Sequence, residues 1–328
     1  MSTSTARNAS PAAPARGTTL LTVRDLAVRL PTGTKNEVRA VNSVSLTVGR
    51  GDRVGIVGES GSGKSVTGRA IAGLLPGSPR VRVSGSIVFD GDEMVGAPPK
   101  AWQAIRSRRV GMIFQDPLTF LNPTMKIGKQ VQESIVARRQ PGVNVREEVL
   151  RFLSLAGLQD VAVLASRFPH ELSGGMRQRV LIAIAIAKLP ELIIADEPTT
   201  ALDATVQQHV LRSLDETVST LGTSLILISH DLAVVAGMTD RIYVMYGGRV
   251  VETGTTASVM GSPRHPYTRA LLRSVTSLTD EGVDLYSIPP ALRAQLDAGA
   301  LDVVIDHDHD RDGDPDPALG AEGEVRAS

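Results

Sequence analysis

The stretch "GESGSGKS", from Gly58 to Ser65, has the residue types and the spacing that bind phosphate groups. Glycines let successive backbone N–H groups curl around phosphate oxygens, and a following helix directs its positive end toward them. In this pattern Lys64 reaches the β- and γ-phosphates, and the hydroxyl of Ser65 ligates Mg²⁺. An apolar strand, "RVGIVG", precedes the loop and a helical stretch follows it. Motif and context together favour a nucleoside triphosphate site over a glycine-rich turn without a ligand.

A second apolar strand, in "LIIADEP", ends in a pair of acidic residues. A phosphate loop has no carboxylates of its own for Mg²⁺ and for the attacking water, and this pair can supply them. Asp196 comes at the carboxyl end of the strand, where ligands bind in open α/β sheets. Its carboxylate can hold Mg²⁺ through water, and Glu197 can orient or polarise an attacking water. A pair of helix-capping carboxylates is the alternative interpretation, and the phosphate loop upstream makes it the weaker one.

Two further polar residues end apolar strands, Gln115 in "FQDP" and His230 in "LISHD". A glutamine amide can contact both a metal and the attacking water, and a neutral imidazole can contact the γ-phosphate. Each signal is weak alone, because most loop glutamines are solvated and a lone histidine after a strand is more often structural. Gln115 and His230 become candidate site residues only because the phosphate loop and the acidic pair occur in the same chain.

A second stretch suited to phosphate stands far downstream, in "LSGGMRQR". Ser173, Gly174 and Gly175 directly precede a long apolar run, so their donors would lie at the beginning of a helix. One chain therefore carries two motifs that can contact phosphate.

Apolar runs of strand length alternate with helical stretches, which predicts an α/β fold with a parallel sheet. The first strands indicate an added antiparallel part, and the middle of the chain indicates a helical part. The expected strands and hairpins are "LLTVRDLAVRL", "VNSVSLTV", "RVGIVG", "VSGSIVFDGDEM", "RRVGMIFQDP", "ELIIADEP", "SLILISHD" and "RIYVMYGGRVVETG", and the expected helices lie in 66–75, 128–168 and 204–221.

Composition bounds the possible functions. The 328 residues include 35 basic and 35 acidic residues, so overall charge gives no argument for nucleic acid or an anionic membrane surface. No cysteine is present, which excludes disulfides and thiolate metal sites. The longest strongly apolar stretch, Val180 to Ala187, is too short to cross a bilayer. If the protein works at a membrane, we expect another chain to supply the span.

The order of these motifs resembles the ATP-binding subunit of ABC transporters, over residues 20–261. The resemblance implies an α/β fold of the P-loop NTPase type, an ABC cassette with a RecA-like parallel-sheet core, an antiparallel β subdomain and a helical signature subdomain. It also implies that two such subunits pack head to tail, each "LSGGM" signature capping the ATP held by the other chain. The second phosphate motif would then serve the neighbour.

The resemblance implies ATP and Mg²⁺ as cofactors and assigns roles by position. Leu30 stands where the family often has an aromatic residue that stacks on adenine, so another apolar contact is expected there. The implied catalytic residues are Glu197, His230 and Gln115; the nucleotide contacts are Gly58, Glu59, Ser60, Gly61, Ser62, Gly63, Lys64, Ser65, Val66, Ser173, Gly174, Gly175 and Asp203 (the last in the "ALD" loop); and the metal ligands are Ser65, Gln115 and Asp196.

Two stretches, "FQDPLTFLNPTMKIGKQVQE" and "SPRHPYTRALLRSV", resemble the oligopeptide/dipeptide importer branch, which includes nickel importers. That branch implies two transmembrane permeases, which would contact the loop at 116–123, and an extracytoplasmic substrate-binding protein. It implies no nucleic acid and a peripheral position on the cytoplasmic face of the cell membrane. Many members carry a cysteine-bearing segment after the "IPP" of "YSIPPALRAQL", and this chain has none.

We expect four segments along the chain. Residues 1–19 form a disordered segment, 20–261 the ATP-binding domain with a helical subdomain at about 116–175, and 262–300 a C-terminal extension. Residues 301–328 form an acidic disordered tail, in which His307 and His309 can bind metal only weakly.

The sequence alone leaves other functions open. A soluble ABC ATPase of DNA repair would need a long coiled coil between the two phosphate motifs, for which there is no room, and translation types usually carry two cassettes. An exporter subunit is disfavoured only by resemblance. The sequence leaves open whether the partner ATPase subunit is identical or paralogous, and which peptide, metal or other solute is carried.

Overall fold

The structure, a computed structural model of the chain, describes residues 18–33, 36–138, 142–200, 202–276, 288–299, 301 and 303–308. Nearly all of the segment predicted to be disordered at the N-terminus lies outside these residues. So do Ala201 and the acidic tail from His309 onward.

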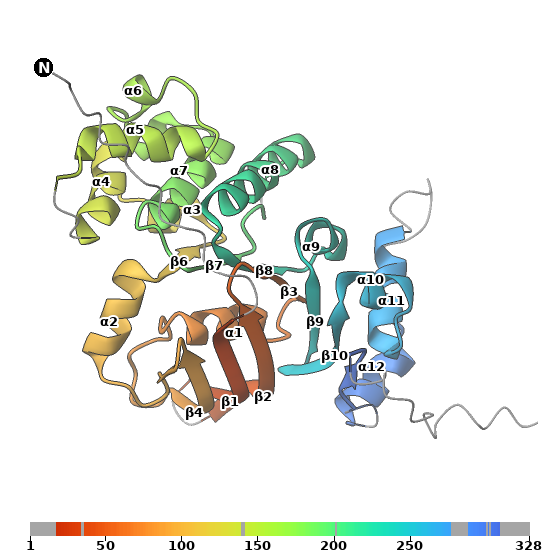
Figure 1. The fold of residues 1–328 in the computed structure, drawn as a ribbon. Coiled ribbons are helices and arrows are strands. Elements are labelled where there is room, and N and C mark those ends of the chain that lie inside the picture. The colour runs from red at the N-terminus through yellow and green to blue at the C-terminus, as the bar shows by residue number, and fades with distance from the viewer. Residues whose placement is uncertain are drawn as a thin grey trace, which may run out of the picture.

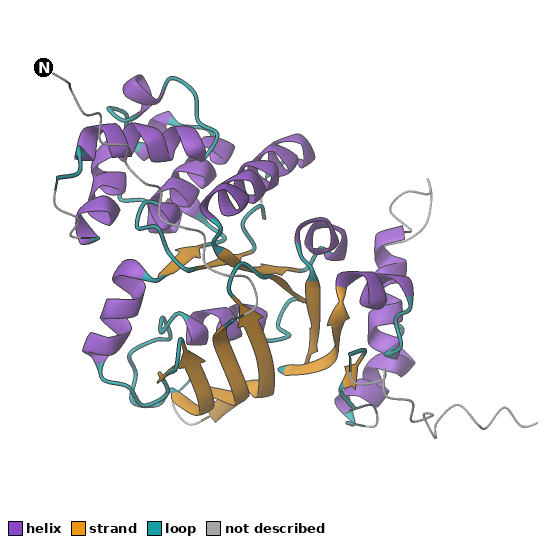
Figure 2. Cartoon of the chain, viewed as in Figure 1, coloured by secondary structure: helices purple, strands orange, loops and turns teal. Residues whose placement is uncertain are grey.

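A seven-stranded sheet runs through the middle of the described part of the chain (Figure 1, Figure 2). Its strand order is β11-β10-β9-β3-β8-β7-β6. The strands from β9 to β6 pair in parallel, whereas β10 is antiparallel to β9, and β11 is parallel to β10. The carboxyl ends of the parallel strands therefore meet at one edge. The bounds are β3 (Arg53–Val57), β6 (Val110–Ile113), β7 (Leu192–Asp196), β8 (Ser224–Ser229), β9 (Arg241–Tyr246), β10 (Arg249–Thr255) and β11 (Ile305–Asp306).

A smaller antiparallel sheet covers one side of this core (Figure 1). Its order is β2-β1-β4-β5, and every pairing in it is antiparallel. Long alternating strands explain it, since the buried residues of β1 and β2 are valine and leucine while most of those between them are polar. The bounds are β1 (Thr19–Thr32), β2 (Asn36–Gly49), β4 (Arg82–Phe89) and β5 (Asp92–Glu93).

Helices cover the opposite side of the central sheet and form most of the region between β6 and β7 (Figure 2), whereas α1 (Lys64–Ile71) and α2 (Pro99–Arg108) pack on the side of the antiparallel sheet. Polar side chains cap several of them, because serine, asparagine and aspartate oxygens accept from free amides of the first turn. The other helices are α3 (Pro117–Phe120), α4 (Ile127–Ala137), α5 (Val145–Leu155), α6 (Val161–Leu164), the 3₁₀ helix η1 (Pro169–Glu171), α7 (Gly174–Ile186), α8 (Ala204–Leu221), α9 (Leu232–Met238), α10 (Thr256–Gly261), α11 (Pro266–Thr276) and α12 (Pro290–Asp297).

The central strands are buried on both faces, so each divides its side chains between two apolar cores. In β7, Ile193 and Ala195 pack with the helical side, whereas Leu192 and Ile194 pack with the antiparallel sheet and α1. Continuous apolar runs such as "LIIA" are typical of strands in this position. The predicted α/β class, with a parallel core, an antiparallel sheet and a helical region, is confirmed.

The beginning of the predicted disordered tail is ordered. Ile305 and Asp306 pair with Glu252 and Thr253 of β10, and the amide of His307 donates to the Thr253 carbonyl at 3.0 Å. The imidazole of His307 lies 2.7 Å from the carboxylate of Glu252, which is fully buried. The acidic composition predicted disorder, but an open strand edge and a buried carboxylate provide partners for this short stretch. Within the described residues no group of three or more histidine and acidic side chains is placed to hold a metal.

None of the helices that the structure describes is long and apolar enough to cross a membrane.

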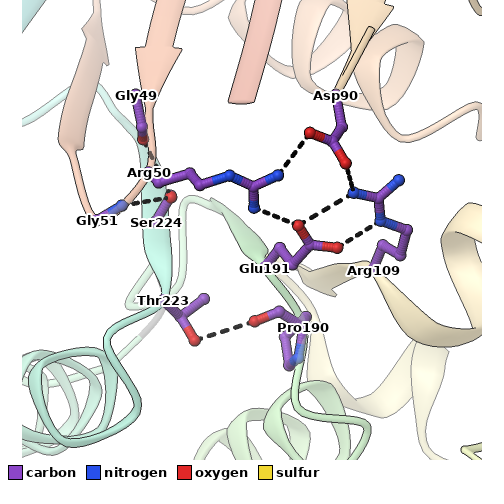
Figure 3. Close-up of polar contacts among 9 residues, drawn as sticks. All are labelled: Gly49, Arg50, Gly51, Asp90, Arg109, Pro190, Glu191, Thr223 and Ser224. Carbon is purple, nitrogen blue, oxygen red and sulfur yellow. Dashed lines mark hydrogen bonds and ion pairs between the residues drawn. The ribbon is translucent and has the colours of Figure 1, made fainter. Parts of the chain in front are cut away.

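Four charged side chains join the antiparallel sheet to the amino ends of the core strands (Figure 3). Arg50 and Arg109 each contact both Asp90 and Glu191, with 2.5 Å between Arg50 and Asp90. Partial burial alone would raise the pKa of Glu191, but hydrogen bonds from Arg109 and Arg50 outweigh it and hold that pKa below its usual range. The carboxylate is therefore more stable ionised in the folded protein than in the unfolded chain.

Two hydroxyl groups complete this junction (Figure 3). The Ser224 hydroxyl accepts from the amide of Gly51 at 2.9 Å and donates to the carbonyl of Gly49 at 3.1 Å. The Thr223 hydroxyl donates to the Pro190 carbonyl at 3.0 Å. The turn after β2 is thus fixed to the beginning of β8.

Replacing Glu191 by glutamine tests the charge network. Glu191→Gln leaves two arginines sharing one carboxylate, and we expect it to lower the free energy of unfolding by about 1–2 kcal/mol at pH 7. Because the folded pKa of Glu191 is depressed, the difference from wild type is present above the unfolded pKa of about 4.3 and disappears as pH falls through the lower folded pKa. Urea unfolding of the variant and the wild type at pH 7 measures the loss of stability, and the same measurement near pH 3 shows whether the difference disappears.

The matched control is Glu216→Gln. Glu216 pairs with Arg212 on α8, and both side chains are largely exposed, at 62% and 79%. Its loss should change stability by less than about 0.5 kcal/mol. Equal effects of the two variants would contradict the role of the network.

Candidate nucleotide-binding site

The phosphate loop connects β3 to α1, and its shape depends on glycine at Gly63. This residue has φ +97°, and a Cβ built there would lie 2.4 Å from the carbonyl oxygen of Ala40 on β2. Gly63 is also the N-cap of α1 and brings no capping side chain. The amides of the first helical turn therefore stay available for an anion, which the helix dipole favours.

Lys64 is buried and folded back over the loop. Its ammonium donates to the carbonyls of Gly58 at 2.7 Å and Glu59 at 2.8 Å, and the Ser62 hydroxyl lies 3.4 Å away. Burial lowers the pKa of Lys64, and the carboxylates of Glu197 and Asp196 oppose this effect. The loop thus holds a positive charge in a fixed place, where it can meet incoming phosphate oxygens.

Ser65 and Asp196 meet at the edge where β7 ends. The Ser65 hydroxyl donates to Oδ1 of Asp196 at 2.6 Å, and Nη2 of Arg69 lies 3.7 Å from Oδ2. Asp196 is 1% exposed, and this burial raises its pKa, although the Ser65 hydrogen bond acts in the opposite direction. A hydroxyl beside an incompletely neutralised buried carboxylate is the kind of oxygen donor set that Mg²⁺ takes, so the residues present fit this ion.

Glu197 and His230 also lie together. The Nδ1 atom of His230 is 3.4 Å from Oε2 of Glu197, and the Thr200 hydroxyl donates to the same oxygen at 2.9 Å. Glu197 has φ +48°, a left-handed conformation that costs a non-glycine residue energy, and its amide donates to the Ile228 carbonyl at 2.9 Å. Strained backbone of this kind often occurs at functional sites, where the surrounding structure maintains it.

Gln115 follows β6 at the same edge of the sheet, two residues beyond the strand. Its side chain is exposed, and among the described residues no hydrogen bond joins it to Ser65 or Asp196, so its role as a metal ligand stays a prediction. Its neighbour Phe114 is linked instead to α7, because Nε2 of Gln178 donates to the Phe114 carbonyl at 3.2 Å. The loop that contains Gln115 is therefore tied to the signature helix.

The signature residues stand at the beginning of α7. Ser173 is exposed and caps the helix, accepting from the amide of Met176 at 3.3 Å. A Cβ at Gly175 would lie only 2.4 Å from the Val206 side chain, so this glycine lets α7 approach α8. The structure gives Gly175 a packing role, whereas Gly174 is exposed. No recorded contact among the described residues joins Ser173 to the phosphate loop of the same chain.

The remaining predicted positions are placed as follows. Asp203 is exposed and caps α8, accepting from the amide of Val206 at 2.9 Å. Leu30 is half-buried near the end of β1, opposite Val38 on β2. Ser60 and Gly61 lie in the β3–α1 connection, and Val66 lies in the first turn of α1.

Sequence reasoning missed two residues that contact the phosphate loop. The Tyr267 hydroxyl accepts from the amide of Glu59 at 2.8 Å, and Arg293 pairs with the Glu59 carboxylate at 3.1 Å. The stretch "HPYT" marked a family branch, but nothing in its pattern indicated a contact more than two hundred residues away. Thr200 was missed as well, although it stands three residues after Glu197.

Comparison with known proteins gives matches along most of the chain. The family "ABC transporter" matches residues 41–200, and "Oligopeptide/dipeptide transporter, C-terminal region" matches residues 251–299. The oligopeptide transport ATP-binding protein OppD of Bacillus subtilis is 46% identical over 84% of this chain and 77% of the relative. The probable D,D-dipeptide transport ATP-binding protein DdpD of Escherichia coli is 47% identical over 77% of each.

Solved structures agree with the sequence matches. A dimeric post-hydrolysis structure of the ATP-binding cassette MJ0796, bound to ADP and Pi, superposes with a TM-score of 0.64 at 26% identity, covering 72% of this chain and 99% of that one. Clostridium perfringens cbiO1, part of the ABC transporter complex cbiONQ, gives 0.63 at 28% identity over 75% and 92% of the two chains.

A methyl group at residue 63 tests the packing of the phosphate loop. Gly63→Ala places its Cβ against the Ala40 carbonyl, so we expect the loop to shift and the Kd for MgATP to rise at least about tenfold. Gly61→Ala is the control, because Gly61 also has a positive φ, +83°, but no atom within 4 Å of a Cβ built there. Calorimetric titration measures the Kd for MgATP of both variants, and melting curves show whether each variant is folded. Equal affinities would argue against this packing constraint.

Proposed function

The chain belongs to the ATP-binding subunits of ABC transporters, and on this premise we propose that it powers the import of oligopeptides or dipeptides. The observation that carries the proposal is the joint match of an ABC cassette and an oligopeptide/dipeptide C-terminal region in one chain. Relatives over 40% identical, spanning most of this chain, are named for oligopeptide or dipeptide transport.

ATP binds with its phosphates on the β3–α1 loop. The amides at the beginning of α1 and the Lys64 ammonium, fixed by two carbonyls, hold the β- and γ-phosphates. Leu30 provides apolar contact for the adenine in place of an aromatic ring. Mg²⁺, when held through Ser65 and Asp196, neutralises phosphate charge. Gln115, which follows β6 at the same edge of the sheet, would join this group.

Glu197 is the residue we assign to the hydrolytic water. Its Oε2 atom is occupied by Thr200 and faces His230, so Oε1 is the oxygen that accepts a proton from the water. His230, which is exposed, can then turn toward the γ-phosphate. The γ-phosphoryl group is transferred to this water, and ADP and phosphate are the products.

A second ATPase subunit completes the site. Ser173 and Gly174 are exposed at the beginning of α7, where a helix N-terminus offers donors to the γ-phosphate held by another subunit. Asp203 is exposed near the same surface, at the beginning of α8, which packs on α7. The dimeric structure of the cassette MJ0796, bound to ADP and Pi, supports the association of two subunits.

Two permeases are the partners that supply the membrane span. The segment 116–123 carries two exposed apolar side chains, Leu118 at 60% and Phe120 at 45%, which suit a protein contact. Its start is linked to α7 through Gln178 and Phe114, so movement of the signature helix can reach the permease surface. The subunit then lies on the cytoplasmic face of the membrane, and an extracytoplasmic binding protein delivers the solute.

Replacing the assigned base tests the hydrolytic mechanism. Glu197→Gln keeps the shape of the side chain but removes the proton acceptor, so phosphate release should fall at least about 100-fold. MgATP binding should stay, and light scattering should detect an ATP-dependent dimer. The exposed Glu216→Gln is the control and should match wild type. Normal turnover in Glu197→Gln would remove Glu197 from this role.

The transport proposal is tested in proteoliposomes. The subunit is co-expressed with candidate permeases and reconstituted with their binding protein, and ATP-dependent uptake of labelled di- and oligopeptides is compared with uptake of nickel. Peptide uptake that is lost in Glu197→Gln supports the proposal. Uptake of nickel alone, or no association with permeases, would contradict it.

A further inference from the structure

One residue of the phosphate loop, Glu59, is held from several sides. Its carbonyl accepts from the Lys64 ammonium at 2.8 Å, within the loop. Its amide donates to the Tyr267 hydroxyl at 2.8 Å, and its carboxylate pairs with Arg293. Tyr267 and Arg293 both belong to the C-terminal extension, on α11 and α12. Two separate helices of this extension therefore converge on the second residue of the loop.

Tyr267 is fixed in place by its surroundings. Its side chain is fully buried and its ring centroid lies 4.9 Å from that of Tyr246. Its amide donates to Nδ1 of His265 at 3.1 Å, which leaves Nε2 of this histidine to donate to the Leu301 carbonyl at 3.2 Å. Burial raises the pKa of Tyr267 and lowers that of His265, so both stay neutral near pH 7. The Tyr267 hydroxyl is thus a rigid acceptor for the loop.

Arg293 provides a second contact of another kind. Its Nη2 atom lies 3.2 and 3.1 Å from the two carboxylate oxygens of Glu59. Both side chains are partly exposed, at 48% and 32%, so this pair contributes less than the buried hydrogen bond. It fixes the Glu59 carboxylate to α12.

The attachment of the extension does not depend on these two contacts. Fully buried Glu252 on β10 accepts from the amides of Arg264 and His265 at 2.8 and 3.1 Å, which fixes the beginning of α11. The Tyr246 hydroxyl donates to Asp297 at 2.6 Å, which fixes the end of α12. The Tyr267 hydroxyl can therefore be removed while the extension stays in place.

We infer that Tyr267 and Arg293 are positioning residues, through which the C-terminal extension sets the phosphate loop for ATP. Tyr267 acts through the Glu59 amide and Arg293 through the Glu59 carboxylate, and both effects reach the Lys64 ammonium through the Glu59 carbonyl. This inference rests on the proposed binding of MgATP at the loop. It makes nucleotide affinity depend on the extension, without any contact between the extension and ATP.

The test uses the full-length chain with Tyr267→Phe, which keeps the ring and removes only the hydroxyl. The Glu59 amide then loses its acceptor, and we expect Kd and KM for MgATP to rise about fivefold, with kcat changed less than about twofold. Tyr243→Phe is the matched control, since it removes a tyrosine hydroxyl that also accepts from a backbone amide, that of Thr47 on β2 at 3.2 Å, away from both the loop and the extension. It should leave Kd and KM at wild-type values.

A double-mutant cycle tests the path through Glu59. Arg293→Gln should raise Kd about two- to threefold, and combining it with Glu59→Gln should add nothing to the effect of Glu59→Gln alone. Additive effects would show that Arg293 acts by another route and would overturn its assignment.

Two results would overturn the role of Tyr267: a wild-type Kd in Tyr267→Phe, or the same weakening in Tyr243→Phe. Melting curves identify a variant that has lost its fold, and in that case the partly exposed Arg293→Gln, which leaves the core intact, must still raise Kd for MgATP. The measurements need only MgATP. A failure of peptide uptake therefore refutes the transport proposal alone, whereas absence of MgATP binding in the wild type refutes the nucleotide site itself.

Discussion

The site depends on one hydrogen bond, between the hydroxyl of Ser65 and the buried carboxylate of Asp196. These residues come from motifs 131 positions apart. They meet because β3 and β7 both pair in parallel with β8, so the helix after β3 begins beside the end of β7. Parallel pairing buries all three strands on both faces, which explains why their interior residues are uniformly apolar. The contact between Ser65 and Asp196 at the edge of the sheet therefore depends on the buried parallel strands.

Backbone atoms packed against the phosphate loop restrict its conformation, in addition to the restriction that phosphate binding places on its residue types. Gly63 lies against the Ala40 carbonyl, and the amide of Gly248 donates to the Ser62 carbonyl at 3.0 Å. The antiparallel sheet and the β9–β10 hairpin thus enclose the loop from two sides. With the contacts from Tyr267, three parts of the chain determine one short loop, which is the preorganisation that tight phosphate binding requires.

The sequence predicted the parts of the site that depend on local spacing. The phosphate loop, the acidic pair and the strand ends follow from motifs whose residues are neighbours in the chain, so their positions could be read directly. The roles that could not be predicted depend on contacts between residues far apart in the chain. Gly175 packs against Val206, and the Tyr267 hydroxyl accepts from the Glu59 amide. The ordered residues near Ile305 were missed for the same reason, since their partners on β10 cannot be inferred from acidic composition.

The short strand β11 has a consequence for the integrity of the sheet. It covers one edge of β10, and its neighbour His307 is the side-chain partner of fully buried Glu252. A chain that ended before Ile305 would leave hydrogen-bonding groups of β10 open to other strands and a carboxylate in the interior without that partner. Such a shortened protein would tend to self-associate through the uncovered edge, even though every nucleotide-binding residue was still present.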